Sequence, residues 1–176
     1  MKYQEVHGEY VNYLARYVEI RQELDCLNKG TVVVKKISGK EYHYLQYRDK
    51  GKTKSIYLKN GQVETVKRDV ARVRVLKSEL DDLCRQLSRL EKGAHILDSN
   101  LVNRFRYLRQ GAEMDAMPLS RRTKALSFIQ AMTALEGLPS PSETEENLRG
   151  WAAGNKRFSD FYLKALQQYH VLEEYA

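Results

Sequence analysis

The chain has 176 residues, enough for one ordinary domain or two small ones. Hydrophobic residues make up 42% and charged residues 30%, which is typical of a globular but highly charged protein. No apolar run reaches the roughly 20 residues of a membrane-spanning helix, and the N-terminus lacks the apolar core of a signal peptide. We therefore expect a cytoplasmic protein without a membrane partner.

The net charge of +7 is distributed unevenly along the chain. Residues 29–78 hold 14 Lys and Arg residues against four acids, so this segment carries +10 and the rest of the chain carries −3. A basic segment of this kind indicates an anionic partner such as nucleic acid. Alternatively, its charges keep an exposed hairpin soluble. Composition leaves both interpretations open.

Residues 9–28 predict a first helix. Their apolar positions recur at alternating steps of three and four, which is the heptad pattern of a helix that pairs with another helix. Tyr10, Tyr13 and Tyr17 lie on this seam. We expect them to belong to a core, because aromatic residues at helical spacing usually pack inside.

After Gly30 the pattern changes to a period of two, which predicts an antiparallel meander of three short strands. The strands are expected at residues 31–37, 42–47 and 55–58. Turn residues separate them at 38–40 and 49–51.

Tyrosines and cations alternate along this meander. We expect Tyr42, Tyr44 and Tyr47 to pack one face of the sheet onto the flanking helices. The alternative hypothesis is a nucleic-acid-binding module, DNA-binding or RNA-binding, in which bases stack on tyrosines and lysines bind phosphates. The candidate phosphate-binding residues are Lys35, Lys36, Lys50, Lys52 and Lys54.

A long helix is predicted over residues 63–92, with valines and leucines at steps of three and four. It is long enough to pair with the first helix as an antiparallel coiled coil, with the meander at its tip. The same seam offers a route to a homo-oligomer. Gly93 marks the first boundary, so we expect one domain over residues 1–95 and a second over residues 96–176.

The second domain is predicted to be a compact array of four short helices. The first begins at Asp98 or Ser99 and is stopped by Gly111; the next begins near Pro118 and carries Glu136. Ser142 with Glu145 forms a capping box for the third helix, which Gly154 ends. Ser159 or Asp160 caps the last, which is expected to run to about residue 174. The predicted fold class is therefore mainly α with a small antiparallel β meander.

Glu136 lies in the last turn of the second of these helices. Gly137 follows it and is typical of the left-handed residue just past a helix end. A carboxylate at this end of a helix is unfavourable by about 0.3–1 kcal/mol, because the helix dipole is negative there. One interpretation is that Glu136 pairs with a cation supplied by a partner. The alternative interpretation is an ordinary solvated glutamate.

The segment around Glu136, residues 122–138, resembles the inhibitory helix of antitoxins that restrain Fic-domain AMP-transferases. The Pro/Ser linker after it, the helix ending at residues 151–154 and the Phe158-Ser159-Asp160-Phe161 stretch are also similar to that family. The resemblance covers roughly the last third of the chain.

This resemblance implies a toxin–antitoxin function that blocks AMPylation. The family's glutamate pairs with a toxin arginine that otherwise holds the γ-phosphate of ATP, so Glu136 and Gly137 would form the inhibitory motif. The family carries Ser or Thr four residues before the glutamate; this chain has Met132 there, followed by Thr133. Apolar contacts to the toxin are expected from Leu135, Leu138 and Trp151.

No arrangement of residues in the sequence supports an enzyme. The four histidines are scattered, and no Gly-rich phosphate loop, nucleophile elbow or paired-cysteine metal motif occurs. We predict a non-catalytic protein that needs no metal and no cofactor. If both binding hypotheses fail, a structural coiled-coil adaptor is the third hypothesis.

Overall fold

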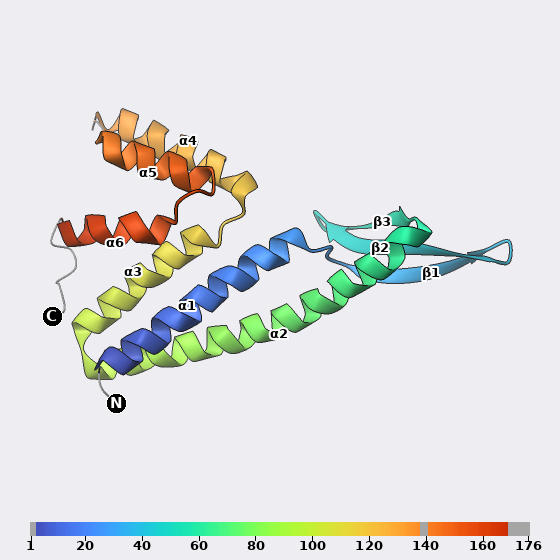
Figure 1. Ribbon diagram of the computed structural model, residues 1–176, viewed down its shortest axis with the longest axis horizontal. Helices are drawn as coiled ribbons and strands as arrows, with labels where there is room; N and C mark the ends of the chain where they lie inside the picture. The colour runs from blue at the N-terminus through green and yellow to red at the C-terminus, as the bar shows by residue number, and fades with distance from the viewer. Residues whose placement is uncertain (1–2, 138–140, 169–176) are drawn as a thin grey trace. The chain divides into compact units, whose positions relative to one another are not determined.

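The computed structural model describes residues 3–137 and 141–168, which are mainly helical with one small sheet, as expected (Figure 1). The elements in chain order are α1 (Tyr3–Cys26), β1 (Thr31–Ile37), β2 (Lys40–Asp49), β3 (Lys52–Leu58), α2 (Asn60–Leu97), α3 (Ser99–Asp115), α4 (Leu119–Leu135), α5 (Ser142–Ala152) and α6 (Phe158–Gln168). The strands are the predicted meander, each at least as long as expected. Within the described residues, no helix is long and apolar enough to cross a membrane.

The chain forms two compact units. The first, here called the helical unit, combines residues 1–22 with residues 83–176, and the second, the sheet unit, consists of residues 23–82. This division differs from the expected one at residue 95. The last turns of α2 carry Leu87 and Ala94, which pack in one cluster with Leu101 of α3, so they belong with the helices that follow.

The centre of the helical unit is an aromatic pair between α1 and α3. The rings of Tyr10 and Phe105 stack with their centroids 3.8 Å apart, and both side chains are buried. The Tyr10 hydroxyl donates a hydrogen bond of 2.7 Å to Glu91 of α2. Burial, together with this bond to a carboxylate, raises the pKa of Tyr10 above its ordinary value. Tyr10 is thus a core residue, as predicted.

Polar contacts join α1 to α2 within each unit. In the helical unit Tyr10 meets Glu91, and in the sheet unit Arg72 donates two hydrogen bonds, of 2.6 and 2.9 Å, to the carboxylate of Glu23. Asn28 donates to Asp69 close by. The buried positions of α2 keep the expected three-four spacing: Val63, Val66, Val70, Val73, Leu76, Leu83 and Leu87.

Two glycines that were expected to end helices lie inside them. Gly93 is in the interior of α2, which continues to Leu97, and Gly111 is in the interior of α3. A Cβ atom added at Gly111 would lie 3.2 Å from the Cα of Ser159, whereas at Gly93 it would meet nothing within 4 Å. Gly111 is therefore a point of close approach between α3 and α6.

Caps in this part of the chain also differ from expectation. Asp98 caps α3 as predicted, but α5 begins after Pro141 without a side-chain cap, so Ser142 forms no capping box. The first backbone N–H groups of α6, those of Phe158 and Ser159, donate to the carboxylate of Asp115. The cap of α6 thus comes from the end of α3.

Arg122 of α4 also stabilises the region around Asp115. Its guanidinium donates to the backbone carbonyl oxygens of Asp115, Met117 and Trp151, at 2.6, 2.9 and 3.1 Å. A buried cation is costly unless it is hydrogen-bonded, and these bonds satisfy it. Arg122 thereby joins the α3–α4 connection to the end of α5, where Gly154 adopts the left-handed conformation expected of a helix stop.

The two interior glycines predict opposite outcomes for the same substitution. Gly111→Val should lower the free energy of unfolding by about 1–3 kcal/mol, because the added atoms press on Ser159. Gly93→Val should change it by less than about 0.5 kcal/mol, because the space is open and valine is no worse than glycine in a helix. Urea unfolding of both variants measures the difference, and equal losses would contradict the close approach.

Candidate nucleic-acid interface

The sheet has one apolar face, and it packs on α2. Leu45 of β2 lies opposite Val32 of β1, and Leu58 of β3 lies opposite His43 of β2. Both leucines are buried in a cluster with Val63, Val66 and Val70 of α2, and Val32 packs against it. Because side chains alternate along a strand, the residues directly next to each of these leucines in its strand point to the other face.

Two tight turns hold the strands in register. Ser38 and Gly39 join β1 to β2 with φ values of 50° and 76°, and Lys50 and Gly51 join β2 to β3 with values of 48° and 78°. Positive φ at both central residues defines the type I′ turn, whose twist matches that of a hairpin. Both turns lie where the sequence predicted them.

The face of the sheet opposite α2 carries three tyrosines. Tyr44 pairs directly with Tyr57 across β2 and β3, and their ring centroids lie 5.7 Å apart; Tyr42 lies 6.2 Å from Tyr57. The Lys35 ammonium lies 4.9 Å from the centre of the Tyr44 ring. None of these four side chains is buried, and Tyr57 is 48% exposed. We call Lys35, Tyr42, Tyr44 and Tyr57 the tyrosine face.

The expectation that the sheet tyrosines pack onto helices is therefore wrong for Tyr42 and Tyr44. Tyr47 lies an odd number of residues from them and shares the face of Leu45. The alternation was visible in the sequence, but the buried face becomes known only once Leu45 is placed on α2. Tyr57, which was not among the predicted site residues, joins the face through its pairing with Tyr44.

The five candidate lysines are divided between the two faces. Of these, Lys35 belongs to the tyrosine face, and Lys50 lies in a turn. The remaining three, Lys36, Lys52 and Lys54, lie on the side of Leu45 by their pairing. In addition, Lys36 pairs with Glu41, and Lys54 pairs with Asp49. Of the five, only Lys35 is thus shown to lie with the tyrosines.

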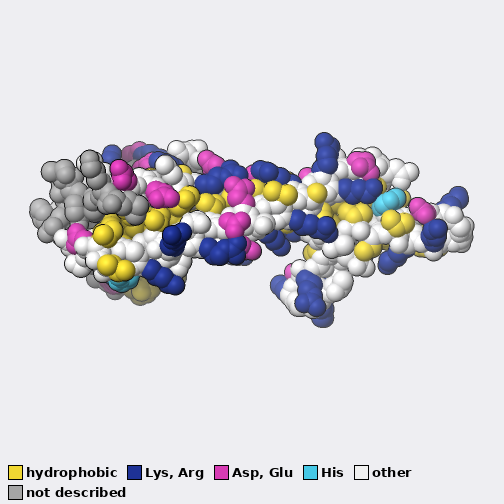
Figure 2. All heavy atoms as spheres, turned by 90° about the horizontal axis from the view of Figure 1, so that it is seen from below, with side chains coloured by type: hydrophobic (Ala, Val, Ile, Leu, Met, Phe, Trp, Pro, Cys, Tyr) yellow, Lys and Arg dark blue, Asp and Glu magenta, His cyan; other side chains and the backbone are white. Residues whose placement is uncertain are grey.

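Two further cations share the tyrosine side of β2. Lys40 and Arg48 alternate with Tyr42 and Tyr44 along the strand, and both are exposed. Neither forms an ion pair with any residue that the structure describes. Figure 2 shows other Lys and Arg side chains spread over the surface of the sheet and α2 on the face in view. The acids of this unit are largely neutralised, since Glu23, Asp49 and Glu64 have cationic partners.

The end of α4, in the helical unit, matches its prediction. Glu136 is the C-cap residue, and its N–H donates to the carbonyl of Met132 at 3.1 Å; Gly137 follows with φ of 66°. Glu136 is exposed. Phe128, Met132 and Leu135 lie at helical spacing along an exposed side of α4, with Leu135 81% exposed. An exposed carboxylate thus adjoins an exposed apolar row.

The other residues predicted for that surface are placed differently. Trp151 is fully buried; its indole N–H donates to the carbonyl of Met114, and Arg122 lies over its ring. It is a core residue in this structure and not an exposed contact. Thr133 donates its hydroxyl to the carbonyl of Ile129 within α4. Leu138 lies outside the described residues.

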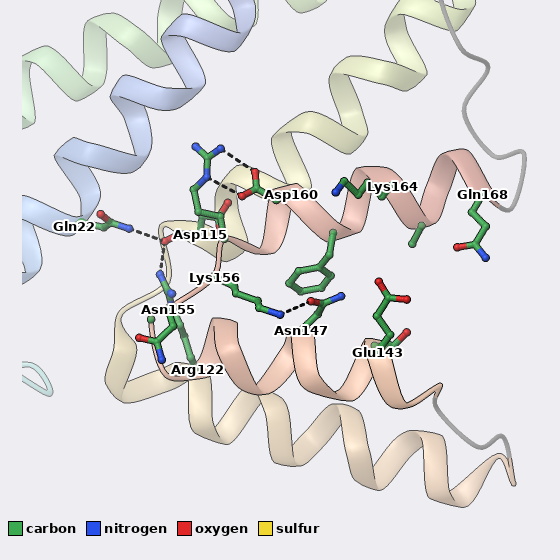
Figure 3. Close-up of a pocket in the computed structure, with 15 residues that line it drawn as sticks. Gln22, Asp115, Arg122, Glu143, Asn147, Asn155, Lys156, Asp160, Lys164 and Gln168 are labelled. Atoms are coloured by element: carbon green, nitrogen blue, oxygen red, sulfur yellow. Dashed lines mark hydrogen bonds and ion pairs between the residues drawn. The ribbon is translucent and has the colours of Figure 1, made fainter.

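A cleft of about 490 Å³ lies between α5 and α6 of the helical unit (Figure 3). Glu143 and Asn147 from α5 and Lys164 from α6 line it, so its charges are mixed. Its buried polar groups, Asp115 and Arg122, already hold the α6 cap and the α3–α4 connection. These features do not define one class of ligand. Across the described residues, no group of three or more His, Cys, Asp or Glu side chains is placed to bind a metal ion.

Residues 2–68 are similar to a family described as a domain of unknown function, DUF6788. The matched segment covers the sheet, including all four residues of the tyrosine face, and ends in the first turns of α2. It spans less than half of the chain and omits the helices from α3 onward. Among curated proteins and solved structures, none matches this chain significantly.

Substitutions at two adjacent residues of β3, Tyr57 and Leu58, test whether the sheet has one buried and one exposed face. Leu58→Ala should lower the free energy of unfolding by about 2–5 kcal/mol, because Leu58 is only 5% exposed and its loss leaves a cavity against α2. Tyr57→Ala should cost about 1 kcal/mol or less, because its ring faces solvent. Chemical denaturation of both variants provides the comparison. A larger loss at Tyr57 would mean that the tyrosine face is covered.

Proposed function

We propose that this protein binds single-stranded nucleic acid on the tyrosine face of its sheet. The observation that supports this most is the cluster of Tyr42, Tyr44 and Tyr57 on the solvent side of the sheet, with Lys35 over one ring. Exposed aromatic rings are platforms for bases, and stacking contributes about 1–3 kcal/mol per base without requiring a particular sequence. Unlike most exposed aromatic residues, these three adjoin one another.

The charge of the sheet unit supports an anionic ligand. Residues 29–78 carry a net charge of +10, and Lys35, Lys40 and Arg48 lie on the same side of the sheet as the rings. Lysine and arginine contacts to phosphate supply affinity that weakens as salt rises, because binding releases counterions. A duplex hides the faces of its bases, so stacking on the tyrosines favours a single strand over a duplex.

Substitutions at Tyr44 should separate the contribution of base stacking to binding from the contribution of charge. Tyr44→Ala should weaken binding of a fluorescein-labelled dT or U oligonucleotide of about 12 nucleotides by roughly 5- to 150-fold, equivalent to about 1–3 kcal/mol of stacking. Tyr44→Phe, which keeps the ring, should bind nearly as well as the wild type. Fluorescence anisotropy at several salt concentrations measures both, with a duplex of the same length as competitor. Wild-type protein that binds no oligonucleotide, or binds duplex equally well, would refute the proposal.

Neighbouring lysines provide a matched control for charge. Lys35→Gln should reduce the slope of log affinity on log salt by about 0.7, the value for one phosphate contact to a single strand. Lys36→Gln should reduce it less, because Lys36 lies on the other face and pairs with Glu41 at 3.4 Å. Equal effects would indicate a diffuse attraction to the basic segment in place of a defined face.

A second function is proposed for the helical unit: antitoxin-like inhibition of a Fic-domain AMP-transferase. The observation that favours it is the exposed row of Phe128, Met132 and Leu135, which leads to Glu136 at the end of α4. An apolar row of this kind suits a protein partner, and the adjoining carboxylate suits a cation in that partner. This assignment also depends on the resemblance of residues 122–138 to the family's inhibitory helix.

Co-expression with a Fic-domain toxin tests this second function. Glu136→Gln should restore AMP transfer to the toxin's target, because an interfacial charge pair that loses one partner is weakened by about 2–5 kcal/mol. Glu143→Gln, which changes an exposed glutamate of α5, is the control and should inhibit like the wild type. Equal inhibition by all three proteins would rule out the role of Glu136, even if a complex forms.

A further inference from the structure

The sheet unit contains a groove beside the end of β2 that the tyrosine face does not include. β1 begins at Thr31, which pairs with Gln46, so residues 47–49 of β2 extend beyond it and pair only with β3. Beside this open edge lies a groove of about 380 Å³, bounded on its other side by α2. We call it the β2 groove.

Cations line the β2 groove on both sides. Arg48 comes from β2, and Arg74 and Lys77 come from α2. None of the three forms an ion pair with a described residue, whereas the acids Asp69 and Glu23 are held by Asn28 and Arg72. Positive charge in a concave site, next to apolar walls of low dielectric, attracts anions more strongly than the same charge on a flat surface.

The backbone at the entrance of the groove is constrained. Gly30 has φ of 150°, and a Cβ atom there would lie 2.3 Å from the carbonyl oxygen of Gln46. The chain leaving α1 therefore passes directly against β2 before it enters β1.

The β2 groove is continuous with the tyrosine face along one strand. Gln46 and Arg48 line the groove, and they also alternate with Tyr42 and Tyr44 on the same side of β2. At about 3.4 Å per residue, the Cα atoms of Tyr44 and Arg48 are roughly 14 Å apart, a distance that one short oligonucleotide can span. Bases on the rings and phosphates in the groove are thus compatible with a single bound strand.

We infer that the β2 groove binds the sugar-phosphate backbone of the single strand whose bases stack on the tyrosine face. This inference rests on the proposed function and extends it: the nucleic acid follows β2 from the rings to the open edge at residues 47–49, and ligands long enough to reach Arg74 and Lys77 beyond that edge bind more tightly. The hydroxyl groups of Thr31 and Thr53 at the groove add neutral donors for phosphate oxygens.

The length of the oligonucleotide provides the test on the full-length protein. The double variant Arg74→Gln, Lys77→Gln should weaken binding of a dT oligonucleotide of about 12 nucleotides severalfold and reduce its salt slope by about 1.4, the value for two phosphate contacts. Binding of a dT tetranucleotide should weaken less, because three of its four bases occupy the rings and few of its phosphates reach Arg74 and Lys77. Circular dichroism and thermal unfolding confirm that the variant is folded.

The matched control is the double variant Lys59→Gln, Arg68→Gln, which removes the same charge outside the groove from two cations that, like Arg74 and Lys77, form no ion pair with a described residue. It should weaken the longer oligonucleotide less than the groove variant does. Equal weakening by the two variants, or equal weakening of both oligonucleotides by the groove variant, would overturn the inference. So would a short polyglutamate peptide that competes as well as the longer oligonucleotide, because the groove would then be a general acidic-peptide site.

Failure of the inference and failure of the proposed function give different results. If only the groove assignment is wrong, the tetranucleotide still binds and its binding still depends on Tyr44. If the proposed function is wrong, neither oligonucleotide binds the wild-type protein, or Tyr44→Ala binds both as well as the wild type.

Discussion

The sheet unit depends on the packing of two leucines against the first turns of α2. Leu45 and Leu58 bury their side chains among Val63, Val66 and Val70. Removing these side chains from water stabilises the unit by about 1.5–3 kcal/mol each. Because side chains alternate along a strand, this one contact also determines the direction of the others. Tyr44 and Tyr57 face solvent because the next residue of each strand, Leu45 or Leu58, packs on α2, and Tyr42 shares the face of Tyr44 by alternation.

A thin sheet that packs on one helix can keep its second face open. A three-stranded sheet needs only one apolar face to be stable when a helix covers it. The open face then carries residues that stability does not require. Here these residues are Tyr57, the rings of Tyr42 and Tyr44 that each lie against it, and a lysine over the Tyr44 ring. In chemical terms the face offers stacking and positive charge, and the groove at the end of β2 adds Arg48, Arg74 and Lys77.

The helical unit is held by a different kind of contact. Asp115, at the end of α3, accepts hydrogen bonds from the first N–H groups of α6, and Arg122 donates to carbonyl oxygens of the α3–α4 connection and of the end of α5. These bonds satisfy helix ends that would otherwise lack partners. They also satisfy Asp115 and Arg122, buried charged residues of this unit, within the fold. Glu136 and the apolar row of α4 are exposed and accessible to a partner. The two proposed functions therefore lie on different units, a protein partner for this surface and a nucleic acid for the tyrosine face.

The sequence by itself determined the type and order of the elements, because these depend on near neighbours. The three-four and two-residue periods identified helices and strands, and Gly39, Gly51 and Gly137 marked turns and a helix end at positions where the structure has positive φ. The basic segment and the exposed Glu136 were also evident. These features follow from local backbone preferences and from charge, neither of which requires a distant residue.

Only the tertiary structure decided which surfaces are free. Gly93 and Gly111 look alike in sequence, but only Gly111 meets another helix, and Trp151 is buried because Met114 and Arg122 come to it from elsewhere in the chain. The face of the sheet that carries Tyr44 was likewise undetermined until α2 covered the other. Burial depends on residues far apart in sequence, so a pattern can pair Tyr42 with Tyr44 on one side without showing whether that side meets a helix or water.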